Sequence, residues 1–185
     1  MKAGATQTVV LSGPTGVGKT TLAQELVRRL GALHVSTSSL ILSIYPSLTP
    51  DRALLQRAGN ALDQETNCRW IADNVTKLGR EHQCRFMVVD AMRRPEQVLA
   101  LREVMTINLT HVHLEASYDH VVHRHSLRSR DIDSGHRYEN LAKDVSESYQ
   151  SELASIADLV LDTENASPPM LGKKVISFLG VVNLA

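Results

Sequence analysis

The sequence predicts an α/β fold in which a parallel β-sheet is covered by helices on both faces. Apolar, strand-like runs alternate with segments of helical spacing along most of the chain. The first run, residues 7–11, is rich in β-branched residues and leads through a glycine-rich turn into a helix over residues 21–30. Strands that alternate with helices form one sheet through right-handed crossovers. Further strands are predicted at residues 32–35, 85–90, 107–114 and 157–162.

The glycine-rich turn fits a phosphate-binding loop. Residues 13–20, Gly-Pro-Thr-Gly-Val-Gly-Lys-Thr, match the pattern G-x-x-x-x-G-K-[ST] at every fixed position. Glycines let successive N–H groups point at an anion, and the helix that follows adds the positive end of its dipole. We expect Lys19 to reach the outer phosphates of ATP and Thr20 to bind Mg²⁺ through its hydroxyl. The residues expected to hold the nucleotide are Gly13, Thr15, Gly16, Val17, Gly18, Lys19, Thr20 and Thr21.

The composition indicates one soluble globular domain over residues 1–185, with ordinary apolar and charged fractions. Its formal net charge is zero, so no excess of positive charge indicates binding to nucleic acid or to an anionic membrane. Cys68 and Cys84 are far apart and form no metal-binding pair. We therefore expect a cytoplasmic protein without nucleic-acid or membrane partners. The oligomeric state stays open.

The strand predicted at residues 85–90 ends in a carboxylate, Asp90. In an open α/β sheet, ligands bind beyond the carboxyl ends of the strands. Because Asp90 follows a phosphate loop in such a sheet, we expect it to organise Mg²⁺ through water. The alternative interpretation is an ordinary turn residue at a strand end. Pro95 is expected in the first turn of the next helix, where its fixed φ fits.

Helical spacing predicts most of the elements between the strands. The serine and threonine cluster at residues 36–39 is expected to cap a helix that begins at Leu40, the alternative being that its hydroxyls lie beside the phosphate loop for a second substrate. From Asp51 the spacing continues to Leu78, with a junction predicted at Gly59–Asn60. Trp70 is expected in the core. The remaining predicted elements are a helix to about Val104, a helix capped by Ser117 or Asp119, a mobile loop at 129–137, and helices at 138–156 and 171–179.

Three histidines, His120, His123 and His125, raise the question of a metal site. Their spacing of i, i+3 and i+5 does not place all three on one helix face, and no cysteine or carboxylate completes a ligand set. We interpret them as solvated side chains.

The chain resembles the adenylate-kinase-like family of nucleoside monophosphate kinases among the P-loop proteins, as a small member with a short lid. Three segments carry the resemblance in addition to the loop. Residues 35–40 resemble the turn after the second strand, residues 88–94 resemble the strand that ends in Asp-Gly and an arginine, and residues 157–162 resemble the last strand. The resemblance implies a three-layer P-loop fold with strand order 2-3-1-4-5. It also implies an acceptor-binding helical insertion at about residues 37–80 and a lid at about residues 128–137.

The resemblance assigns roles to several residues. Thr37 and either Arg93 or Arg94 would hold the acceptor phosphate, with Asp90 beside them. Arg52 and Arg57 are further candidate anion ligands, the alternative being solvated helix residues. Lys19 would be catalytic together with arginines of the helix end and lid, one of which would lie along the donor adenine. These lid-side residues are Arg124, Arg128 and Arg130, with Asp133 beside them.

The function expected is transfer of the ATP γ-phosphoryl to a nucleoside monophosphate or a similar small phosphate acceptor, with Mg²⁺ as cofactor. Ala91 and Ser39 depart from the family pattern, since glycine and aspartate are common at these positions. Two alternatives stay open. One is an ATP-binding switch or ATPase of the same fold, and the other is a kinase of a non-nucleotide small molecule.

Overall fold

The computed structural model describes residues 6–104, 108–126 and 149–181, with the backbone alone at 125 and 126. It contains a five-stranded parallel sheet in the order β2-β3-β1-β4-β5, which confirms the predicted fold and strand order. The strands are β1 (Gln7–Ser12), β2 (Leu33–Ser36), β3 (Phe86–Met92), β4 (Leu109–Glu115) and β5 (Leu159–Asp162). The helices are α1 (Lys19–Leu30), α2 (Thr37–Ile44), α3 (Arg52–Thr66), α4 (Trp70–His82), α5 (Pro95–Val104), α6 (Tyr118–Ser126), α8 (Gln150–Ser155) and α9 (Pro168–Phe178).

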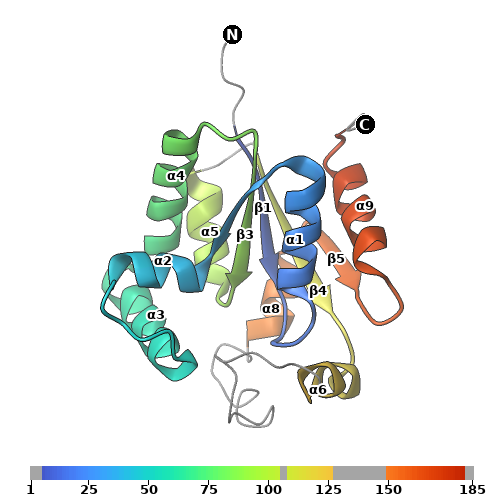
Figure 1. Ribbon diagram of the computed structural model, residues 1–185, viewed down its shortest axis with the longest axis horizontal. Coiled ribbons are helices and arrows are strands. Elements are labelled where there is room, and N and C mark those ends of the chain that lie inside the picture. The colour runs from blue at the N-terminus through green and yellow to red at the C-terminus, as the bar shows by residue number, and fades with distance from the viewer. Residues whose placement is uncertain (1–5, 105–107, 127–148, 182–185) are drawn as a thin grey trace.

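Helices cover both faces of the sheet (Figure 1). The central strand β1 contributes alternate side chains to two cores, as its pleat requires. Val10 packs with apolar residues of α2, α3, α4, α5 and α8, whereas Val9 and Leu11 pack with those of α1 and α9. Because both faces of the sheet are buried, the carboxyl edge of the strands is where a ligand can reach the loops.

Helices α2, α3 and α4 pack against one another in the region where the sequence predicts an acceptor-binding insertion. Ser36 caps α2, because its hydroxyl accepts from the Ser39 N–H while Ser39 Oγ accepts from the Ser36 N–H. The helix thus begins at Thr37, three residues before the predicted start. Asp51 caps α3 by accepting a hydrogen bond from the Leu54 N–H.

The junction predicted at Gly59–Asn60 is wrong. Helix α3 runs through both residues to Thr66, and the chain turns instead at Asn67 and Cys68, which both have positive φ. Gly59 serves packing rather than termination, because a Cβ there would lie 3.3 Å from Cδ1 of Ile41 in α2. The glycine lets two helices approach closely without breaking either of them.

The later elements follow the predicted order. Pro95 opens α5, Trp70 is 4% exposed as expected for a core residue, and the closing helix is α9. The predicted lid at about residues 128–137, with Arg128, Arg130 and Asp133, lies outside the described residues, as does most of the predicted helix 138–156. None of the described helices is both long enough and apolar enough to cross a membrane.

Candidate active site

The phosphate loop connects the end of β1 to α1, with Gly13, Gly16 and Gly18 at positive φ. A Cβ on Gly13 would lie 2.4 Å from the carbonyl oxygen of Leu114, so glycine is required where the loop passes β4. Lys19 Nζ donates hydrogen bonds to the carbonyl oxygens of Gly13 and Pro14, at 2.6 and 2.8 Å. The ammonium therefore lies across the mouth of the loop, where the outer phosphates of a nucleotide would bind.

A carboxylate and a hydroxyl meet beside the loop. Asp90 Oδ2 accepts a hydrogen bond from Thr20 Oγ1 at 3.0 Å, and His34 Nε2 lies 3.8 Å from the same oxygen. Burial alone would raise the pKa of Asp90, but the contacts with His34, Lys19 and Thr20 outweigh it and lower the pKa below the ordinary value. The carboxylate is therefore ionised at neutral pH.

These residues fit a magnesium ion. Asp90 is 5% exposed, and its Oδ1 is buried without a hydrogen-bond partner in the described part of the chain. Such an oxygen can accept a cation, or the water of a hydrated cation, as its partner. Mg²⁺ commonly uses one or two protein oxygens together with substrate phosphates and water, which the pair of Thr20 and Asp90 can provide.

Arg124 of α6 lies against the phosphate loop and the turn after β5. Its Nη1 donates to Thr163 Oγ1 at 2.9 Å and to the Val17 carbonyl at 3.3 Å, and its Nη2 donates to the Thr163 carbonyl at 2.5 Å. These contacts join α6, the phosphate loop and the turn after β5. Arg124 also lines a cavity suited by position to the nucleoside part of a nucleotide bound in the loop. The other residues of this cavity are Gly16, Val17, Gly18, Thr21, Leu22, Thr163, Ala166, Pro168 and Leu171.

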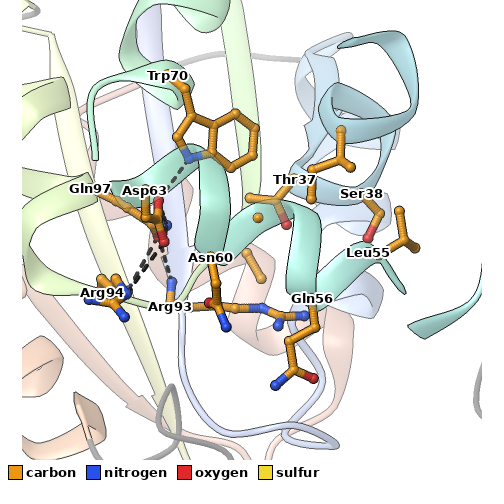
Figure 2. A pocket seen from close by; sticks show the side chains of 13 residues that line it. Thr37, Ser38, Leu55, Gln56, Asn60, Asp63, Trp70, Arg93, Arg94 and Gln97 are labelled. Carbon is orange, nitrogen blue, oxygen red and sulfur yellow. Dashed lines mark hydrogen bonds and ion pairs between the residues drawn. The ribbon is translucent and has the colours of Figure 1, made fainter. Parts of the chain in front are cut away.

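A second cavity opens on the opposite side of the loop, between α2, α3 and the end of β3 (Figure 2). It reaches Ala91, the residue after Asp90, so a molecule bound there lies next to the Asp90 carboxylate. Three predicted acceptor residues, Thr37, Arg93 and Arg94, line it, whereas Arg57 lies on the exposed side of α3 outside the lining. The other lining residues are Ser38, Ile41, Leu55, Gln56, Gly59, Asn60, Asp63, Trp70, Ala91 and Gln97.

A buried carboxylate, Asp63, binds several of the side chains that line this cavity. Asp63 is 6% exposed and accepts hydrogen bonds from Trp70 Nε1 at 2.7 Å and from Gln97 Nε2 at 2.9 and 3.0 Å. Because the Gln97 amide nitrogen faces Asp63, its oxygen faces the other way and accepts from the N–H groups of Arg93 and Arg94. Asp63 thereby fixes the turn between β3 and α5.

The two arginines of this turn have different surroundings. Arg94 Nε lies 3.4 Å from Asp63 Oδ2, and its guanidinium lies over the ring of Tyr149 at 5.3 Å from the centroid. The Arg93 side chain extends away from Asp63, in the direction of Gln56 (Figure 2). Both arginines line the cavity, but Arg94 is held by the Asp63 cluster, whereas Arg93 extends toward Gln56.

We expect Asp63→Ala to destabilise the protein by roughly 3 kcal/mol or more, because it leaves the buried groups of Trp70 and Gln97 and the partly buried guanidinium of Arg94 without their acceptor. Urea unfolding at pH 7 measures the free energy. Asp73→Ala, an exposed aspartate in the first turn of α4, is the matched control and should cost under about 1 kcal/mol. Equal losses in the two variants would contradict the organising role of Asp63.

Two histidines lie buried beneath the phosphate loop. Ser12 Oγ lies 2.6 Å from His111 Nε2 and 2.8 Å from His113 Nδ1, and all three side chains are at most 2% exposed. A hydroxyl can donate to one ring nitrogen and accept from the other, so the arrangement suits two neutral imidazoles. Burial lowers the pKa of both histidines to about 4, and for His113 the neighbouring His111 and Lys19 add to the effect.

The buried pair predicts a loss of stability in acid. Both pKa values are lower in the folded protein than the ordinary 6.5, so the unfolded chain takes up protons first. The free energy of unfolding should therefore fall as the pH drops from about 6.5 toward 4, by up to about 1.4 kcal/mol per pKa unit for each histidine. Urea unfolding at several pH values measures this loss. His111→Gln and His113→Asn should reduce it, while His82→Gln, at an exposed site in α4, should not.

A phosphate loop at the carboxyl edge of a parallel sheet in the order 2-3-1-4-5, with a carboxylate beside its threonine, defines a P-loop nucleotide-binding fold. A family model described as an AAA domain matches residues 9–155. The chain therefore belongs to this AAA-domain family.

Solved structures support the same fold at low sequence identity. Shikimate kinase from Acinetobacter baumannii, in complex with shikimate, has a TM-score of 0.66 at 17% identity, covering 97% of this chain and 96% of that one. The tunicamycin resistance protein of Deinococcus radiodurans has a TM-score of 0.65 at 18% identity, covering 96% and 97%. A gluconokinase from Sinorhizobium meliloti has a TM-score of 0.50 at 15% identity, covering 95% and 93%. The search of curated proteins gives no match.

Proposed function

We propose that the protein is an ATP-dependent phosphotransferase that moves the ATP γ-phosphoryl to a nucleoside monophosphate or a similar small phosphate acceptor. The observation that carries the proposal is the adjacency of two sites. The phosphate loop and Asp90 lie on one side, and an arginine-containing cavity begins at the next residue, Ala91. Phosphoryl transfer needs little more from a protein than such positioning together with neutralisation of charge.

The residues divide the reaction between them. Lys19 and the N–H groups of the loop hold the β- and γ-phosphates. Thr20 and Asp90 would hold Mg²⁺, which when bound neutralises charge on the phosphate oxygens. As an oxygen of the acceptor attacks the γ-phosphorus, the bond from this phosphorus to the β–γ bridging oxygen breaks and ADP leaves. Arg124 supports the nucleoside end of the donor, and Arg128 and Arg130 are proposed to close over the phosphates.

The cavity favours an acceptor that is already an anion. Asp63 is the one carboxylate among the described residues that line the cavity, and it is engaged by Trp70, Gln97 and Arg94. It is therefore poorly placed to remove a proton from a hydroxyl nucleophile. A phosphate monoester needs no such base, and Arg93 and Thr37 offer it a guanidinium fork and a hydroxyl. Arg57, on the exposed side of α3 outside this lining, stays a candidate anion ligand.

A kinase of a non-nucleotide small molecule is the second candidate. Gln56 and Asn60 give the cavity two side-chain amides that can donate and accept hydrogen bonds, which suits a ligand with several hydroxyl groups. Solved structures of similar fold include shikimate kinase and a gluconokinase, whose names state small hydroxylated substrates.

The test is a screen of the purified protein with Mg·ATP against a panel of nucleoside monophosphates and of small hydroxylated acids, with product detection by mass spectrometry. We expect ADP formation to rise severalfold with at least one monophosphate, accompanied by a diphosphate product. Transfer to a hydroxylated acid alone would select the second candidate. Hydrolysis of ATP without any phosphorylated product would replace both candidates with an ATPase.

A further inference from the structure

One face of α3 joins the acceptor cavity to the phosphate loop. Leu55, Gln56, Gly59, Asn60 and Asp63 line the cavity, at spacings that place them along one side of the helix. Arg52 precedes Leu55 by three residues and Gln56 by four, so it extends the same stripe by one turn toward the loop.

Arg52 reaches the phosphate loop directly. Its Nη2 donates a hydrogen bond to Thr15 Oγ1 at 3.1 Å, across 37 positions of sequence. The side chain is partly buried and its Nε is shielded from solvent. Thr15 is the third residue of the loop and follows Gly13 and Pro14, whose carbonyls hold the Lys19 ammonium.

Two cations thus converge on three consecutive residues of the loop. Arg52 is the first residue of α3 and directly follows the N-cap residue Asp51. A phosphate group bound at the mouth of the loop would lie between the Lys19 ammonium and the Arg52 guanidinium and would attract both.

We propose that Arg52 is a catalytic residue that contacts the γ-phosphoryl group of ATP from the acceptor side. The proposal rests on the phosphotransferase function above. Arg124 is less suited to this role, because its contacts with Thr163 and the Val17 carbonyl place its guanidinium at the other cavity, away from the acceptor side. As the bond to the β–γ bridging oxygen breaks and the bond to the acceptor oxygen forms, the equatorial oxygens of the moving group face the Arg52 fork.

The test compares two nucleotides and needs no acceptor. Calorimetry with Mg·ADP and with the Mg²⁺ complex of the β,γ-imido analogue of ATP measures how much the γ-phosphate adds to affinity. We expect Arg52→Gln to weaken binding of the analogue at least about tenfold while leaving ADP affinity within about twofold. Arg52→Lys, which keeps the charge but loses the fork, should give an intermediate loss. Arg80→Gln, at an exposed arginine in the last turn of α4, is the matched control and should change neither affinity.

The outcomes separate this proposal from the broader one. Equal weakening of both nucleotides by Arg52→Gln, with an unchanged thermal midpoint, would assign Arg52 to the shape of the loop and overturn the catalytic role. Unchanged binding of both nucleotides would overturn it as well. If the variant unfolds, the same comparison on Arg52→Lys decides, since a lysine fills the same space. Failure of the unmodified protein to bind either nucleotide would instead remove the phosphotransferase function itself.

Discussion

Lys19→Ala should lower the rate of ATP turnover by at least about 10³-fold. The lysine places a cation at the mouth of the loop, where its ammonium lies within 2.8 Å of the Gly13 and Pro14 carbonyls. In the ligand-bound loop the same ammonium would face the oxygens of the β- and γ-phosphates, whose negative charge grows on the leaving side during transfer. Alanine leaves that charge without a partner. Release of ADP from Mg·ATP, followed with a coupled assay, measures the loss.

The fold should be insensitive to this substitution, because Lys19 is only partly buried and its described bonds are to the loop that it spans. Equal thermal midpoints for the variant and the unmodified protein would establish this. Lys77→Ala, at an exposed lysine that lies 3.9 Å from Glu81 in α4, is the matched control and should retain full turnover. Turnover that survives in Lys19→Ala would show that the hydrolysing site is elsewhere.

The phosphate loop was predictable from the sequence because its chemistry depends on one contiguous stretch. Glycines, a lysine and a threonine at fixed spacing have to follow a strand and precede a helix, and residues 7–30 show this order. The position of Asp90 beside the loop was predictable for a related reason, since strand ends in an open parallel sheet meet at one edge. In both cases local sequence and the general rules of the fold were sufficient.

The wall of the second cavity, the proposed acceptor site, was not predictable in the same way. Asp63 lies in the middle of a helix and has the appearance of a solvated carboxylate, but its partners Trp70 and Gln97 are 7 and 34 residues away. Only the packing of α3 against the turn after β3 brings these groups together. The same contact distinguishes Arg93 from Arg94, which the sequence leaves as equal alternatives. His111 and His113 were likewise hidden, because an alternating strand predicts a polar face but does not show that a second layer of helices covers it.

Asp90→Asn should greatly reduce the extent to which Mg²⁺ strengthens nucleotide binding and raises the rate of turnover. The substitution keeps the size of the side chain and an oxygen that can accept from Thr20 Oγ1, but it removes the negative charge. The contacts that lower the Asp90 pKa keep this group ionised throughout the neutral range, so the unmodified protein presents a full charge to a cation in any ordinary assay. We expect turnover at saturating Mg²⁺ to fall by roughly 10²-fold or more, and the Mg²⁺ concentration for half-maximal rate to rise.

A comparison of ATP binding with and without Mg²⁺ separates a magnesium role for Asp90 from a structural one. In the unmodified protein Mg²⁺ should strengthen binding of the ATP analogue, and in Asp90→Asn this gain should shrink while metal-free binding improves slightly, because a negative charge near the phosphates is gone. Asp73→Asn, at the exposed aspartate of α4, should leave the gain intact. If Asp90→Asn weakens binding equally with and without Mg²⁺, the carboxylate supports the loop through its contact with Thr20 and does not organise the cation.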